Sequence, residues 1–211
     1  MTHPGIVAFG AYVPRLRLSR ELIAAATGWM RRGDAGTSGG ERSFCNWDED
    51  VVTMAVEAAR DCLANCDRSS LDALCLASTT MPFDDRSNAG IVAAALDLDP
   101  TCRTGDVCGS QRAGVSALHD ALERARPAGA SLVVAADRRL ARPGSEQEFA
   151  YGHAAAAVLL GVDDVIAEYV GGSAIQEDFV DHYRGAGQPF DYVMEERWVR
   201  DEGHLRLLPA A

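Results

Sequence analysis

The sequence predicts an α/β protein with one mixed, five-stranded sheet and helices on both of its faces. Apolar runs of strand length alternate with longer segments in which apolar residues recur every three or four positions. The 211 residues, 47% of them hydrophobic, are enough for one sizeable core. Neither G-x-G-x-x-G nor G-x-x-x-x-G-K-[ST] occurs, which disfavours a nucleotide-binding version of this class.

The first part of the chain is expected to form a strand and then two helices. Residues 5–14 are an apolar strand closed by Pro14. Ser19 is placed as the N-cap of a helix ending near Gly28, and the glycine-rich residues 33–40 predict a flexible loop. Acidic residues complement the helix dipole, so Trp47 and Asp48-Glu49-Asp50 are expected to open the second helix. Its apolar face comprises Val51, Met54, Ala55, Ala58, Ala59, Cys62 and Leu63.

Strands and helices are expected to follow one another from there to residue 171. Strands are predicted over residues 73–80, 103–107, 131–137, 154–161 and 165–170, the last two joined by a tight turn. Helices are predicted over residues 89–96 and through the small residues that follow Cys108, and residues 138–146 are read as a polar loop. We assign residues 1–171 to one domain. Residues 172–211 are polar, aromatic and charged without an apolar period, so they are read as an extended arm or, alternatively, as an ordinary ordered tail.

Cys108 is the first candidate for chemistry, because the strand over residues 103–107 is expected to turn there into the next helix. Free N–H groups and the positive dipole end at a helix N-terminus stabilise a thiolate, which is the nucleophilic form of cysteine. The same N–H groups could hold the oxyanion of a thioester under attack. The alternative is a buried structural cysteine.

Charge and cysteine usage exclude several classes of protein. The net charge is −11 and all 20 basic residues are arginine, so there is no basic stripe for nucleic acid and no lysine for Schiff-base chemistry. Cys62 and Cys66 are one helical turn apart, but no second Cys/His pair completes a metal site. With no apolar run of membrane length and no leader pattern, we expect a cytoplasmic protein with reduced thiols.

Several motifs, in their order and spacing, resemble a known family. The chain resembles the N-terminal half of the thiolase superfamily, in the branch of 3-hydroxy-3-methylglutaryl-CoA synthases and type III ketoacyl synthases. Residues 195–203 resemble a linker in bacterial and archaeal members. The other matching segments are Gly10-Ala11-Tyr12-Val13-Pro14, Asp48-Glu49-Asp50 with Thr53-Met54-Ala55, Gly105-Asp106-Val107-Cys108, Ala135-Ala136-Asp137 and Leu159-Leu160-Gly161.

The resemblance implies one half of an α-β-α-β-α sandwich. It also implies that Cys108 accepts an acyl group from a coenzyme A thioester, a substrate rather than a bound cofactor, before a carbon–carbon bond is made or broken. A dimer of this core is expected, and some relatives bind an OB-fold, zinc-ribbon protein.

Two features depart from the family pattern. Thr79 stands where the synthases place a glutamate general base, and a hydroxyl is not a base near neutral pH. The family's catalytic histidine and much of its CoA tunnel belong to the second half, which these 211 residues do not include. We therefore expect a second subunit to carry that half, since the helix after Cys108 would otherwise expose an apolar stripe.

The other candidate residues carry alternatives. Gly109 and Thr79 are oxyanion or pocket candidates. His153 could reach the pocket or be a satisfied structural histidine. Arg112 could bind a CoA phosphate or form an ordinary salt bridge.

Three functions follow from these observations. The first is a subunit of an acyl-CoA C-acyltransferase with Claisen or retro-Claisen chemistry through acyl-Cys108. The second is a hydroxymethylglutaryl-CoA synthase-type condensation, which Thr79 disfavours. The third is a non-catalytic structural half of a thiolase-like complex.

Overall fold

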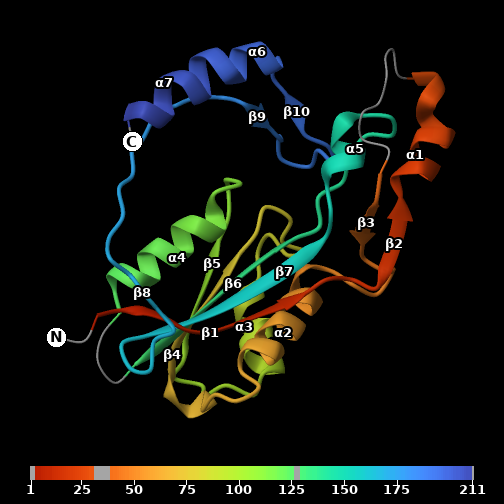
Figure 1. The fold of residues 1–211 in the computed structure, drawn as a ribbon. Coiled ribbons are helices and arrows are strands. Elements are labelled where there is room, and N and C mark those ends of the chain that lie inside the picture. The colour runs from red at the N-terminus through yellow and green to blue at the C-terminus, as the bar shows by residue number, and fades with distance from the viewer. Residues whose placement is uncertain (1–2, 31–38, 126–128, 211) are drawn as a thin grey trace.

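The structure is a computed structural model that describes residues 3–30, 39–125 and 129–210. Most of the loop expected at residues 33–40 lies outside the described residues. The central sheet has the strand order β5–β4–β6–β7–β1–β8 (Figure 1). Its strands are β1 (Gly5–Tyr12), β4 (Leu71–Ala77), β5 (Arg103–Val107), β6 (Ala130–Asp137), β7 (Ala154–Gly161) and β8 (Ala167–Glu168).

The sheet is mixed, as predicted, but it has six strands rather than five. β4 runs parallel to β5 and β6, whereas β7 is antiparallel to both β6 and β1. The sixth strand is β8, which keeps two residues of the strand predicted over residues 165–170 and pairs with β1 at the edge. β7 and β8 are therefore not a hairpin, because β1 lies between them.

One face of the sheet is covered by α2 (Val51–Cys62) and α3 (Asn88–Ala95). α2 begins at Val51 and not at Trp47, because Asp50 is its N-cap: the Asp50 carboxylate accepts from Thr53 N, and the Thr53 hydroxyl accepts from Asp50 N. The apolar face predicted for this helix is buried, and it packs closely on β1. Gly10 permits this approach, since a Cβ there would lie 2.7 Å from Ala58 O and 2.8 Å from Cys62 Cα.

The other face is covered in part by α4 (Ala113–Glu123), which packs mainly on β6 and β4 (Figure 1). Ala113 and Ala117 are buried against the sheet, where small side chains allow close packing. The outward side of α4 and the nearby part of β1 stay uncovered, with Val115 and Phe9 each 71% exposed. Two large apolar side chains are thus exposed on this face, but the small apolar residues expected to be bare on this helix pack against the sheet of the chain itself.

A smaller unit beside the sheet was not predicted. β2 (Leu16–Ser19) pairs antiparallel with β3 (Glu41–Phe44), and α5 (Glu146–Ala150) lies next to α1 (Arg20–Thr27). Ser19 caps α1 as predicted, with its hydroxyl accepting from Glu21 N at 3.2 Å. No helix among the described residues combines the length and apolar character needed to cross a bilayer.

Residues 172–210, which we call the arm, leave the sheet after β8 and arch over the α4 side (Figure 1). The arm turns back on itself through β9 (His182–Tyr183) and β10 (Tyr192–Val193), which pair antiparallel. It ends in a helical stretch made of α6 (Glu196–Trp198), a π-helical turn (Val199–His204) and α7 (Leu205–Leu207). Phe179 stacks on Trp198 with ring centroids 5.9 Å apart, so the arm has a small apolar contact of its own.

Candidate functional site

Cys108 follows β5 directly and is the exposed member of the six free cysteines. The predicted strand 103–107 is confirmed, but α4 starts at Ala113, so Cys108 does not occupy the helix N-terminus. A turn separates them: Gly109 has φ +86°, and Ala113 N donates to Ser110 O at 3.0 Å. Within the described residues no acceptor bonds the N–H of Gly109, so this group is free to donate to a ligand oxygen.

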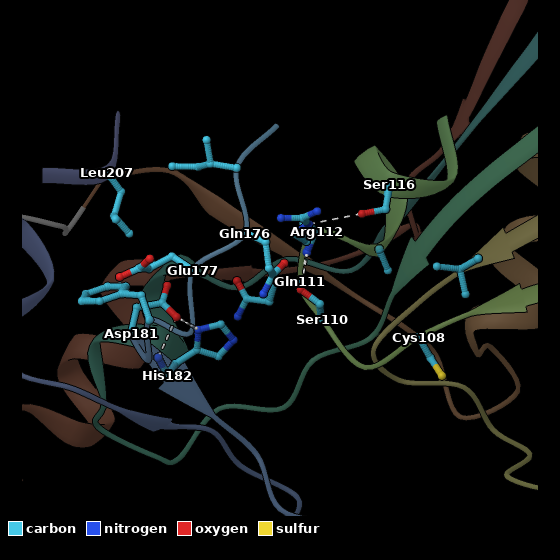
Figure 2. A pocket seen from close by; sticks show the side chains of 14 residues that line it. Cys108, Ser110, Gln111, Arg112, Ser116, Gln176, Glu177, Asp181, His182 and Leu207 are labelled. Atoms are coloured by element: carbon cyan, nitrogen blue, oxygen red, sulfur yellow. Dashed lines mark hydrogen bonds and ion pairs between the residues drawn. The ribbon is translucent and has the colours of Figure 1, made fainter. Parts of the chain in front are cut away.

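A cavity of about 580 Å³ separates the Cys108 loop from the arm. On the loop side it is lined by Cys108, Ser110, Gln111 and Arg112, and on the arm side by residues that include Glu177, Asp181 and His182. Figure 2 shows the Sγ of Cys108 pointing away from the arm residues, with Ser110 and Gln111 between them.

Thr79 lies beyond the end of β4. This strand ends at Ala77, whereas the sequence predicted a strand that continues to Thr80. Its backbone N–H and hydroxyl both donate to Asp137 Oδ1, at 2.8 and 3.0 Å. The hydroxyls of Ser78 and Thr80 donate to the same oxygen at 3.0 and 2.9 Å. Three consecutive hydroxyl residues thus bond the end of β4 to the end of β6. None of the three carries a carboxylate, so the end of β4 supplies no acidic side chain.

A second cavity of about 320 Å³ brings Thr79 and Gly109 together with His182, Arg184 and Asp191 of the arm. The guanidinium of Arg184 donates to the carbonyl oxygen of Thr79 in a short hydrogen bond. The arm therefore contacts the strand end at the position where the family resemblance places a general base.

The arm is held to the core by a buried cluster of Asp191, Arg139, Arg184 and Tyr151. The Asp191 side chain is 1% exposed; it lies 2.6 Å from Arg139 Nη2 and accepts from the Tyr151 hydroxyl at 2.6 Å. Arg184 Nη1 is 3.6 Å from the other carboxylate oxygen. Burial alone would raise the pKa of Asp191, but the hydrogen bond from Tyr151 and the two arginines outweigh it and lower that pKa. Burial and the bond to Asp191 raise the pKa of Tyr151 to about 12.

His153 is buried, and it does not line the two cavities described above. Its Nδ1 accepts from Cys45 N at 2.9 Å, so Nε2 carries the proton and donates to Arg139 O at 3.2 Å. Burial lowers the pKa of His153, which favours this neutral form. The structure thus places His153 as a connector between β3 and the start of β7.

Arg112 lines the larger cavity and donates from Nε to Ser116 Oγ at 3.3 Å. No carboxylate within the described residues pairs with its guanidinium, which leaves it available to an anion.

The sequence reasoning missed the arm as a source of site residues. Asp181, His182, Arg184 and Asp191 stand in a segment without apolar periodicity, which gave no indication of where it would dock. The adjacent Asp-His pair was the one local signal available, since a carboxylate beside an imidazole is a common acid–base arrangement.

Comparison with known sequences finds several hydroxymethylglutaryl-CoA synthases among the relatives. No protein-family model matches the chain. The hydroxymethylglutaryl-CoA synthase of Methanocaldococcus jannaschii is 31% identical over 194 residues, covering 88% of this chain and 55% of the relative. That of Picrophilus torridus is 30% identical over 210 residues, covering 96% and 59%. The chain thus spans little more than half the length of the curated relatives it matches.

Solved structures show the same fold. A crystal structure of HMG-CoA synthase complexed with CoA superposes with a TM-score of 0.86 at 23% identity, over 99% of this chain and 54% of that one. MvaS in complex with 3-hydroxy-3-methylglutaryl coenzyme A gives 0.84 at 24% identity, over 95% and 50%. OleA of Xanthomonas campestris gives 0.80 at 20% identity, over 99% and 72%.

The sequence similarity and the superposition point the same way, and each covers little more than half of the relative. In sequence the chain is thus similar to the hydroxymethylglutaryl-CoA synthases, and it shares their thiolase-like fold over about half of such a protein.

Proposed function

We propose that this chain is the acyl-accepting half of a thiolase-superfamily acyltransferase, with Cys108 as the nucleophile and a coenzyme A thioester as the substrate. The observation that carries the proposal is the exposed Cys108 at the end of β5, on the wall of a cavity large enough for part of such a substrate. The hydroxymethylglutaryl-CoA synthases among the relatives favour a condensation of that type over Claisen or retro-Claisen chemistry.

The first step transfers the acyl group from the sulfur of coenzyme A to the sulfur of Cys108. The Cys108 thiolate attacks the thioester carbonyl, the carbonyl oxygen becomes an oxyanion, and the bond to the CoA sulfur then breaks. The N–H of Gly109 can donate to that oxyanion, since it has no other acceptor in the described residues. The CoA thiolate leaves with a proton from solvent, and the acyl group stays on Cys108. Arg112 is suited to bind a phosphate of CoA at the mouth of the cavity.

The same proposal includes a partner. Val115 on α4 and Phe9 on β1 expose apolar surface, and the matched synthases are almost twice as long as this chain. We assign this face to a second thiolase-like half carried by another subunit, in a dimer of the core. The chemistry of CoA thioesters and the six free thiols fit the cytoplasm.

Mass spectrometry of the intact protein after incubation with acetyl-CoA tests the first step. The chain, purified with any polypeptide that accompanies it, should gain one acetyl group that maps to Cys108. Cys108→Ala should remove that adduct. Cys102→Ala is the matched control, because Cys102 precedes β5 at the other end of the same strand and lines neither cavity.

Two outcomes would contradict the proposal. Acetylation that survives in Cys108→Ala would place the acyl group elsewhere, and no acetylation of the wild type would favour the non-catalytic structural half. Native mass spectrometry of the same preparation tests the partner: a fully active lone monomer would refute it, and co-purification of an OB-fold, zinc-ribbon protein alone would not replace the missing half.

A further inference from the structure

We propose that His182, oriented by Asp181, moves the α-proton of a bound acyl thioester, the task for which the end of β4 offers Thr79 and no carboxylate. The inference rests on the function proposed above and adds a residue of the arm to the reacting site.

Asp181 and His182 form a hydrogen-bonded pair. Asp181 Oδ1 lies 2.7 Å from His182 Nδ1 and also accepts from His182 N at 2.8 Å. The backbone is fixed as well, because Val193 pairs with His182 in the two-stranded sheet and Met194 N donates to Asp181 O at 2.9 Å. A carboxylate on Nδ1 holds that nitrogen in its N–H form, and this leaves Nε2 as the proton acceptor.

The imidazole faces the site from the arm. His182 lines both the cavity that contains Cys108 and the cavity that contains Thr79 and Gly109. Its side chain is 21% exposed, and within the described residues no bond occupies Nε2. Figure 2 shows the ring turned from Asp181 toward the loop of Ser110 and Gln111. Two residues after His182 the arm is bonded to the core, where the Arg184 side chain donates to the carbonyl oxygen of Thr79.

Other carboxylates of the two cavities already have partners. Glu177 pairs with Arg206 at 2.8 Å, and Asp191 is the buried partner of Arg139 and Arg184. Asp181 is engaged by His182 itself. The Cys108 sulfur points away from the ring, so His182 is not placed to act on the thiol itself.

The step balances without a co-reactant. Nε2 takes a proton from the carbon next to the thioester carbonyl, the C–H electron pair becomes the enolate, and the imidazolium is stabilised by Asp181. Return of the proton regenerates the thioester. In condensation the enolate carbon attacks a ketone instead, and the proton passes to the new alkoxide.

Exchange of the acetyl protons of acetyl-CoA in deuterated water measures this step directly. The wild-type chain, with its co-purifying polypeptides, should exchange them, and His182→Ala should lose on the order of 10²–10⁴-fold in exchange rate. Acetylation of Cys108 should persist in the variant, and added imidazole should restore part of the exchange. His204→Ala is the matched control: His204 is an exposed histidine of the same arm and lines neither cavity.

Each outcome is decisive. Exchange at the wild-type rate in His182→Ala, or an equal loss in His204→Ala, would overturn the inference, as would an acetylated wild type that does not exchange. Loss of Cys108 acetylation in both His182→Ala and His182→Gln would show a structural role and also overturn it. If the wild type is never acetylated at Cys108, the proposed function itself has failed and this inference fails with it.

Discussion

Replacing Asp191 by asparagine should release the arm from the core while the sheet stays folded. Asp191 is the common partner of Arg139, Arg184 and Tyr151, and its side chain is 1% exposed. The asparagine is nearly isosteric, but it leaves two guanidinium groups near a neutral amide in a buried place. The substitution should therefore reduce the free energy of docking between the arm and the core, because that contact depends on this cluster.

The magnitude follows from the burial. Breaking a buried ion pair by removing one partner costs about 3–5 kcal/mol, because the remaining charge is left uncompensated. Since each 1.4 kcal/mol is a factor of ten, the ratio of docked to undocked arm should fall by roughly 10²- to 10⁴-fold. The sheet contacts of β1, β6 and β7 do not involve Asp191, so global unfolding should change much less.

Trypsin gives a direct assay. The chain has no lysine, so trypsin cuts after arginine alone, and the Arg184 side chain is 18% exposed when the arm is docked. Cleavage after Arg184 should be slow in the wild type and much faster in Asp191→Asn. Asp201→Asn is the matched control, because Asp201 pairs with Arg200 on the exposed side of the same arm. Equal cleavage of Arg184 in both variants would refute the reasoning.

The same cluster sets the pH dependence of docking. The folded pKa of Asp191 is lowered, so its contribution is present above the ordinary carboxyl value and is lost only as pH falls through the lowered value in acid. The pKa of Tyr151 is raised from 10.0 to about 12, so its contribution is complete below pH 10 and is lost as pH rises through 12. The undocked fraction of the arm should therefore increase at both extremes, where trypsin is inactive and near-ultraviolet circular dichroism of the tyrosine and tryptophan side chains can follow it instead.

Two further changes follow from packing and burial. Gly10→Ala should destabilise the protein by about 1–3 kcal/mol, because the added Cβ would meet the backbone of α2. Gly28→Ala is the control and should be near neutral, because a Cβ at that position has no neighbouring atom within 4 Å. Equal urea midpoints for the two variants would contradict this. Burial raises the pKa of Cys45 and Cys62 to about 11, so at pH 8 roughly 0.1% of each is thiolate, and iodoacetamide should label both far more slowly in the native state than in urea. Native labelling of Cys62 at the rate seen in urea would show that it is not buried.

The elements that the sequence predicted well are those set by local patterns. The strands over residues 103–107 and 154–161 have the predicted bounds, and Ser19 caps its helix, because apolar runs and capping residues act over a few positions. The predicted start of α4 was wrong by several residues, since the turn depends on the positive φ of Gly109, and a glycine permits this conformation without requiring it. The pairing of β2 with β3 escaped prediction because it joins segments that are distant along the chain.

The candidate site residues named from the sequence all come from the part of the chain that forms the sheet and its loops, and none comes from the arm. Cys108, Gly109, Thr79 and Arg112 lie around the two cavities, whereas His153 is bonded elsewhere. The arm contributes its residues through Asp191 and Arg184, whose partners come from the loop after β6 and the strand end at Thr79. No local pattern reports a contact between residues so far apart, and for this reason the Asp181–His182 pair was missed.

The position of β1 between β7 and β8 has a consequence for how the chain is made. Gly5 pairs with Gly161, so β1, which is synthesised long before β7, cannot take its place until β7 has emerged. Closing that loop of roughly 150 residues costs about 4–5 kcal/mol. At about 5–20 residues per second, α2 waits on the order of 5–20 s before β1 and β7 can cover it. Its apolar face is therefore the surface that the nascent chain offers to chaperones and to other unfinished chains, and mutations that slow translation between α2 and β7 lengthen that exposure.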